Sequence, residues 1–137
     1  MKKIIFVFPL IFIMACAKDQ QALNKLEGTW TYKKASVFGI TLDLASLGYA
    51  NATVKFERCS THDTHCGGTL SLPNVTPSNF LYNINKSGDE ISVLNTNGST
   101  TKYNIVKLDD HNLVYTTNID TGAGTPISIA VQFTCAK

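Results

Sequence analysis

The sequence predicts an all-β protein, an eight-stranded antiparallel up-and-down barrel with short helical turns before the first strand and within residues 35–51. Thr, Val, Ile, Tyr and Phe alternate with polar residues along most of the chain, which is typical of half-buried strands. Turn-forming sequences such as Lys86-Ser87-Gly88-Asp89 and Asn97-Gly98 separate these runs. No helical period is sustained after Cys16. Successive strands with one apolar face can bury that face by closing into a barrel, and a two-sheet sandwich is the alternative.

The expected strands share this alternation and are bounded by the turn-forming sequences. They lie at Gly28–Lys34, Ala52–Arg58, Gly68–Leu72, Asn79–Asn85, Glu90–Thr96, Thr101–Leu108, Asn112–Ile119 and Pro126–Cys135. In the last of them, Ile129, Val131 and Phe133 share one face, whereas Gln132 lies on the other. The interior of an eight-stranded barrel is just wide enough for side chains or for one small ligand.

Residues 1–16 have the layout of an export signal. Lys2 and Lys3 precede an apolar run from Ile4 to Ala15, as in a secretory signal peptide, and the run is too short to span a membrane. The sequence Ile13-Met14-Ala15-Cys16 resembles the lipobox of bacterial lipoproteins. This resemblance implies that residues 1–15 are removed and that Cys16 is lipidated. An ordinary secretory peptide followed by a coincidental cysteine is the alternative.

The expected domain organisation follows from this signal. Residues 1–15 form the signal peptide, residues 16–25 the lipidated cysteine and its tether, and residues 26–137 the barrel domain. Acyl chains on Cys16 would hold the protein on a membrane. We therefore expect the domain to lie in the oxidising space of a bacterial cell envelope. An aspartate directly after the lipidated cysteine would resemble the inner-membrane retention signal of some bacteria. Ala17 occupies this position instead, which favours the outer membrane.

Charge and motifs limit the possible functions. The 12 basic residues include Lys2 and Lys3, and there are 10 acidic residues, so the processed domain is formally neutral. Nucleic-acid binding requires a basic excess, so we expect no nucleic-acid partner. The sequence contains no G-x-S-x-G elbow, no H-E-x-x-H motif and no glycine-rich phosphate loop. We therefore expect neither an enzyme nor a bound cofactor.

The segment Leu26-Glu27-Gly28-Thr29-Trp30 opens the first expected strand. Gly28 and Trp30 resemble the G-x-W start of lipocalins and their small bacterial relatives. The resemblance implies a short helical turn before the first strand and a tryptophan that plugs the closed end of the barrel. Two departures from the lipocalin pattern are evident, since the later T-D-Y signature is replaced by Leu113-Val114-Tyr115-Thr116 and no arginine near the chain end can stack on the tryptophan.

The longest expected connection, residues 35–51, is unusually apolar for a loop. Its large apolar side chains are those of Val37, Phe38, Ile40, Leu42, Leu44, Leu47 and Tyr49. A connection with so many of them must cover apolar surface. Two interpretations remain open. The segment is a lid over a ligand cavity, or it forms a short helix at Leu42–Leu47 that completes the core.

Two function hypotheses from different classes follow. In the first, the chain is a lipid-anchored binding protein that holds a small apolar molecule beneath residues 35–51. The candidate ligand-binding residues are Trp30, Phe38, Phe56, Tyr82 and Tyr115. In the second, the chain is an envelope interaction or structural protein with a filled barrel, and its protein partner is not indicated by the sequence.

The cysteines allow a disulfide or a metal site. Cys59, His62, His65 and Cys66 could supply four zinc ligands, but nearby cysteines in an oxidising space form a disulfide. We therefore expect a Cys59–Cys66 bridge and no metal. The remaining cysteine, Cys135, either pairs with one of the loop cysteines or stays unpaired and points into the barrel.

Overall fold

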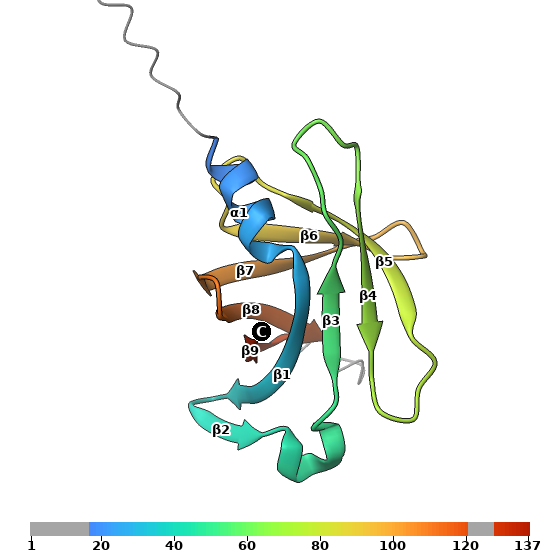
Figure 1. The fold of residues 1–137 in the computed structure, drawn as a ribbon. Helices are drawn as coiled ribbons and strands as arrows, with labels where there is room; N and C mark the ends of the chain where they lie inside the picture. The colour runs from blue at the N-terminus through green and yellow to red at the C-terminus, as the bar shows by residue number, and fades with distance from the viewer. Residues whose placement is uncertain (1–16, 121–127) are drawn as a thin grey trace, which may run out of the picture.

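The computed structural model describes residues 17–120 and 128–137 (Figure 1). The elements in chain order are helix α1 (Lys18–Leu26), strands β1 (Gly28–Val37) and β2 (Ile40–Asp43), the short helical segment η1 (Ala45–Tyr49), and strands β3 (Thr53–Phe56), β4 (Cys66–Ser71), β5 (Ser78–Ile84), β6 (Glu90–Leu94), β7 (Thr100–Leu108), β8 (Asn112–Asp120) and β9 (Ser128–Ala136). Cys16 and the expected signal peptide lie outside the described residues, so the lipidation remains a prediction.

The strands form one antiparallel sheet that closes on itself. β3 to β9 pair with their sequence neighbours in order, and β1 pairs with both β3 and β9. Thr31 of β1 is in register with Thr53 of β3 on one side and with Ala136 of β9 on the other. The ring of β1 and β3 to β9 confirms the eight-stranded up-and-down barrel, and the two-sheet sandwich is wrong.

β2 is a strand that the sequence analysis did not predict. It pairs with the second half of β1, from Lys34 opposite Asp43 to Val37 opposite Ile40. Phe38 and Gly39 turn the chain between them, with φ of 51° and 80°. Residues with a side chain rarely adopt positive φ, so Phe38 gave no turn signal. β2 and β3 therefore extend along one edge of β1, with η1 between them.

The short helical turn expected before the first strand is present as α1, so residues 18–25 of the expected tether are helical and pack on the barrel. Ala22, Leu23 and Leu26 are buried, and Leu26 is fully so. The spacing of these three residues places them on one face of the helix, and that face covers one end of the barrel (Figure 1). None of the helices in the described part of the chain has the length and hydrophobicity needed to cross a membrane.

The connections between strands gather at two opposite ends of the barrel. At the end covered by α1, called the closed end, lie residues 57–65, 85–89 and 109–111 (Figure 1). At the other end, called the mouth, lie residues 38–52, 72–77 and 95–99. The seventh connection, residues 121–127, and the predicted start of the last strand at Pro126 fall outside the described residues.

The most deeply buried side chains are concentrated at the closed end. The largest fully buried ones are those of Trp30, Tyr82, Leu26, Leu113 and Cys135. All of them come from the ends of strands or of α1 that meet there. The solid core therefore occupies one end of the barrel and leaves the mouth half less completely filled.

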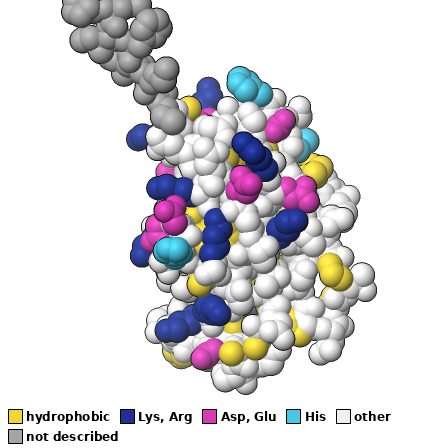
Figure 2. All heavy atoms as spheres, viewed as in Figure 1, with side chains coloured by type: hydrophobic (Ala, Val, Ile, Leu, Met, Phe, Trp, Pro, Cys, Tyr) yellow, Lys and Arg dark blue, Asp and Glu magenta, His cyan; other side chains and the backbone are white. Residues whose placement is uncertain are grey.

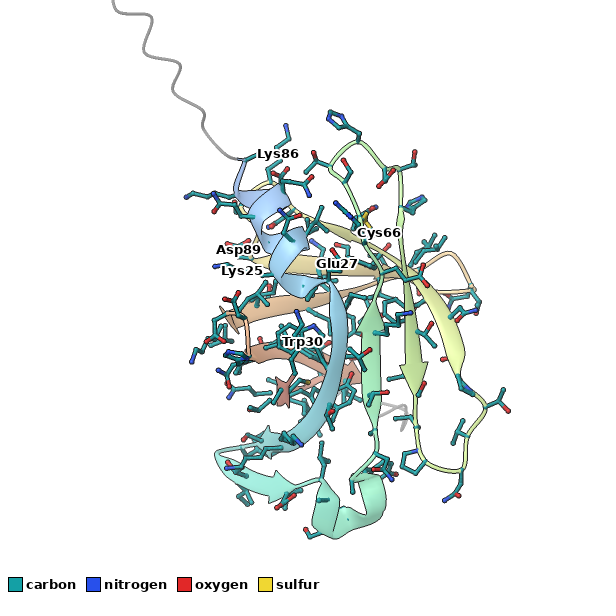
Figure 3. All side chains as sticks on the ribbon, viewed as in Figure 1. Lys25, Glu27, Trp30, Cys66, Lys86 and Asp89 are labelled. Carbon is teal, nitrogen blue, oxygen red and sulfur yellow. A yellow bond between two sulfur atoms is a disulfide. The ribbon has the colours of Figure 1, made fainter. Side chains whose placement is uncertain are left out.

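Trp30 of β1 contacts both α1 and the last residue, Lys137, at the closed end (Figure 3). Its Nε1 donates a hydrogen bond of 2.7 Å to the carbonyl oxygen of Leu26, the last residue of α1. The Lys137 Nζ lies 4.4 Å from the centroid of the Trp30 ring and donates to the carbonyl oxygen of Lys25 at 2.8 Å. The chain end thus supplies a lysine as the cation over the tryptophan, where no arginine was available.

Candidate ligand-binding site

Two cavities lie inside the barrel and reach its mouth. The first cavity has a volume of about 340 Å³ and is lined mainly by β3 to β6, with apolar side chains from Val54, Phe56, Phe80, Ile91, Val93 and Leu94. The second has a volume of about 600 Å³ and lies beside β8, β9 and residues 44–52, with apolar side chains from Leu44, Tyr49, Ala52, Leu72, Ile119 and Phe133. Both volumes fall within the range of small-molecule sites, roughly 300–1,000 Å³.

The two cavities meet at a group of tyrosines that we call the tyrosine junction, Tyr32, Tyr103 and Tyr115. Together with Leu70, these residues line both cavities. The Tyr32 and Tyr115 hydroxyls lie 2.8 Å apart and are hydrogen-bonded. The Tyr103 ring packs edge-on against Tyr115, with centroids 5.5 Å apart. The junction places polar hydroxyls in the middle of a mostly apolar space.

An aromatic cluster separates the first cavity from the closed end. The Phe56 ring makes edge contacts with Phe80 and Tyr82, at centroid distances of 5.8 and 5.1 Å. The Tyr82 hydroxyl donates to the Glu57 carbonyl oxygen at 3.3 Å. Gly68 of β4 is required here, because a Cβ at this position would overlap the Phe80 ring. Phe56 and Phe80 face the cavity, whereas Tyr82 lies behind them.

The structure divides the predicted ligand-binding residues into three groups. Phe56 and Tyr115 line a cavity, and their role in ligand binding stays a prediction. Trp30 and Tyr82 are fully buried in the closed end and line neither cavity. The placement predicted for Phe38 is wrong, since it lies at the tip of the β1–β2 hairpin with 81% of its surface exposed.

The sequence analysis missed three residues of the cavity linings that the alternation could have indicated. Tyr32 is two residues after Trp30 and so lies on the same strand face. Tyr103 alternates in the same way along β7, and Leu70 along β4. Alternation therefore places all three on inward faces, as it does Trp30.

Residues 44–52 lie at the edge of the second cavity, where a lid would be placed. Leu44, Tyr49 and Ala52 contribute to the lining. η1 contains no buried residue, so the alternative of a helix that completes the core is not supported. The preceding hairpin does not cover the cavity, because Ile40 is 66% exposed, and hydrophobic side chains are visible over β2 and η1 in Figure 2.

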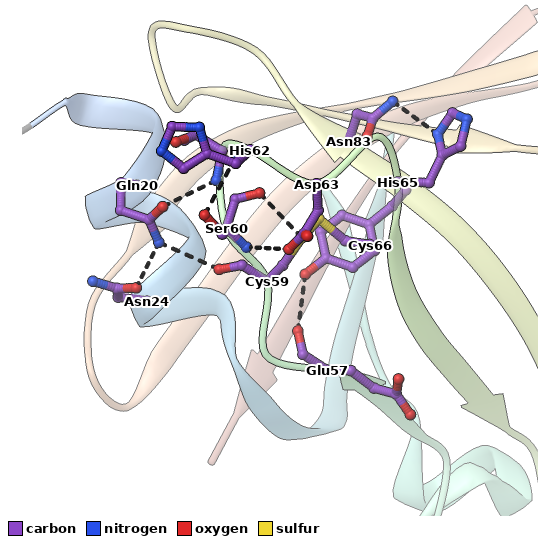
Figure 4. Close-up of a disulfide and its surroundings, with 12 residues drawn as sticks. Gln20, Asn24, Glu57, Cys59, Ser60, His62, Asp63, His65, Cys66 and Asn83 are labelled. Carbon is purple, nitrogen blue, oxygen red and sulfur yellow. Dashed lines mark hydrogen bonds between the residues drawn. A yellow bond between two sulfur atoms is a disulfide. The ribbon is translucent and has the colours of Figure 1, made fainter.

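The predicted disulfide between Cys59 and Cys66 is confirmed (Figure 4). Their Cα atoms are 5.5 Å apart, within the usual range for a bridge. The side chain of Gln20 holds the loop against α1, since its Nε2 donates to the Cys59 carbonyl oxygen at 3.3 Å and its Oε1 accepts from the Thr61 amide at 3.0 Å. The bridge and this contact fix the loop at the closed end.

The zinc alternative for this loop finds no support. The two sulfurs are bonded to each other, and His65 is hydrogen-bonded to Asn83 at 3.2 Å. Within residues 17–120 and 128–137, no group of three or more His, Cys, Asp and Glu side chains is arranged to hold a metal ion.

Cys135 is unpaired and completely buried in the hydrophobic core of the barrel. The alternative that it pairs with a loop cysteine is therefore wrong. Burial raises the pKa of the Cys135 thiol to about 12, so the thiol is protonated and unreactive at neutral pH.

This burial predicts that alkaline pH destabilises the protein. The unfolded chain releases the Cys135 proton near pH 8.5, whereas the folded protein keeps it up to about pH 12. The free energy of unfolding should therefore fall as the pH rises between these values. About one pH unit above the unfolded pKa, the wild type should lose about 1.4 kcal/mol more than Cys135→Ala. Denaturant unfolding of both proteins at neutral and alkaline pH measures this, and identical pH slopes would contradict it.

Comparison with known proteins identifies no family for this chain. No protein-family profile matches the chain, and no curated protein matches it in sequence. The functional interpretation therefore depends on the barrel and its cavities.

Proposed function

We propose that the chain is a membrane-anchored, lipocalin-like lipoprotein of the bacterial cell envelope that binds a small apolar ligand in its barrel. The observation that carries this proposal is the pair of cavities that meet at the tyrosine junction. Their linings are mostly apolar, so each methylene group of a ligand that enters them contributes about 0.8 kcal/mol by leaving water. The proposed activity is binding without chemical conversion of the ligand.

The position of α1 supports an orientation for the anchored protein. Cys16 directly precedes Ala17, and α1 begins at Lys18 over the closed end (Figure 1). A lipid on Cys16 would therefore attach the protein to the membrane on the side of the closed end. In this arrangement the mouth faces away from the membrane, and the cavities are open to ligands on that side.

Ligand binding is tested by filling the space where the cavities meet. Leu70→Trp adds volume to a residue that lines both cavities and should weaken binding of a neutral fluorescent probe such as Nile red by about tenfold or more. Leu81→Trp is the matched control, because Leu81 is 44% exposed and lines neither cavity. Equal probe affinities for the two variants would reject the cavity as the binding site. Mass spectrometry of an organic extract of the purified protein would identify the natural ligand.

Anchoring is tested separately by substitution of the lipobox cysteine. In a bacterial host, the wild-type chain should be recovered with the membranes and should incorporate a clickable palmitate analogue. Cys16→Ser removes the thiol that accepts the lipid, so the protein should shift to the soluble fraction and lose the label. A Cys16→Ser protein that remains in the membranes would contradict lipid anchoring.

The exposed hairpin favours a second candidate function, an interaction with another envelope protein through the mouth. Phe38 and Ile40 expose 81% and 66% of their surfaces, and such adjacent apolar side chains are typical of interaction sites. A photo-crosslinking amino acid at Phe38 should then capture a specific partner in cells, and the same residue at Asn97, in another mouth connection, should not. Equal labelling from both positions would argue against this candidate.

A further inference from the structure

The tyrosine junction holds hydroxyl protons for which the structure shows no acceptor. In the Tyr32–Tyr115 pair, one hydroxyl donates to the other, so one proton of the pair is free to donate to a ligand. Among the described residues, neither hydroxyl has a further hydrogen-bond partner, and the Tyr103 hydroxyl has none.

The other polar side chains of the linings differ from these tyrosines. Of those that are not exposed, Asn95 donates to Thr101 at 2.9 Å and Thr117 donates to the Lys102 carbonyl oxygen at 3.2 Å. Thr101 only accepts in this contact, so its hydroxyl is one further donor, in the second cavity. The remaining ones are exposed to solvent at the mouth: Ser78, Asn79, Thr96, Asn118 and Asp120. The junction therefore provides the hydrogen-bond donors that are shared by both cavities.

The linings also lack a positive charge to pair with an anionic ligand. No lysine, arginine or histidine is found among the described residues that line either cavity, and the one carboxylate, Asp120, is exposed. Burial raises the pKa of Tyr115 well above its ordinary value, and that of Tyr32 also, which shows that negative charge is disfavoured at the junction. An ionised carboxylate buried there would lose its hydration without gaining a counter-ion.

From these observations we infer that the barrel prefers an uncharged ligand with a hydrogen-bond acceptor inside an apolar body, such as a fatty-acid ester, over the free fatty acid. The acceptor lies at the tyrosine junction, and the apolar arms on its two sides extend into the first and second cavities. This inference rests on the proposed function, since it specifies the ligand class of the same site.

The test compares three ligands of similar shape in displacing Nile red from the wild-type protein: ethyl laurate, lauric acid and tetradecane. At pH 8 lauric acid is ionised. We expect ethyl laurate to bind at least about tenfold more tightly than lauric acid. If lauric acid binds as tightly as the ester, the inference is overturned and the proposed function stands. If none of the three ligands displaces the probe, the proposed function fails and the inference fails with it.

The role of the hydroxyls is tested by changing all three junction tyrosines to phenylalanine. This variant should bind ethyl laurate about tenfold more weakly than the wild type and tetradecane about equally well, because only the ester accepts a hydrogen bond. Tyr82→Phe is the matched control, since it removes a buried hydroxyl outside both cavities. Unchanged ester binding by a folded triple variant would overturn the inference. If the variant does not fold, the ratio of ester to acid affinity in the wild type decides the question.

Discussion

Replacing Trp30 with alanine is expected to destabilise the folded barrel by about 3–5 kcal/mol. Trp30 is fully buried at the closed end, so the substitution leaves a large cavity among residues that cannot collapse into it. It also removes the Nε1 hydrogen bond to Leu26 and the aromatic face beneath Lys137. Denaturant unfolding followed by far-ultraviolet circular dichroism measures the change.

Two further variants separate the causes of this loss. Trp30→Phe keeps much of the buried apolar area but removes the donor to the Leu26 carbonyl oxygen, so it should lose less stability than Trp30→Ala. Phe38→Ala removes an aromatic side chain that is 81% exposed and should change stability by less than about 0.5 kcal/mol. Similar losses for Trp30→Ala and Phe38→Ala would contradict the placement of the core at the closed end.

Removing the disulfide is expected to cost about 2.5 kcal/mol of stability. The Cys59–Cys66 bridge closes a loop with a sequence separation of 7, and the loop-entropy relation gives this magnitude for such a short loop. The double variant Cys59→Ala, Cys66→Ala should therefore melt at a lower temperature than the wild type, as measured by differential scanning calorimetry.

Reduction of the wild-type protein provides the control for this variant. A reductant should lower the wild-type melting temperature towards that of the double variant and should leave the variant itself unchanged. Cys135 does not complicate the comparison, because it is buried and unpaired. A wild-type melting temperature that is insensitive to reductant, with the reduced thiols verified by mass, would show that the bridge does not stabilise the fold.

The sequence predicted most of the barrel because alternation is a local property that survives without tertiary information. The strands around Val54 and Phe56, or Val131 and Phe133, present their apolar residues on one face, and the structure buries or half-buries that face. β2 was missed because it follows a turn at Phe38, which gives no turn signal. A short helical turn was expected before β1, and α1 is longer because its mostly polar residues are stabilised as a helix by packing on the barrel.

The candidate site was predicted less completely, and two residues of β1 show why. Trp30 and Tyr32 lie on the same face of the same strand, yet Trp30 is enclosed by α1 and the chain end, whereas Tyr32 lines both cavities. Alternation specifies whether a side chain points into the barrel but does not specify its depth along the barrel axis. That depth decides whether an inward aromatic ring belongs to the core or to the ligand site.

The sequence by itself determined the all-β class and the order of most strands, and it favoured the pairing of Cys59 with Cys66, because each depends on residue type and spacing along the chain. Only the tertiary structure decided that α1 seals one end, that Phe38 is exposed and that the tyrosines meet between two cavities. These features arise where segments distant in sequence come together: Tyr32 and Tyr115 lie 83 residues apart in the chain and within hydrogen-bonding distance in the barrel. Contacts of this kind depend on how the sheet closes, which no local pattern encodes.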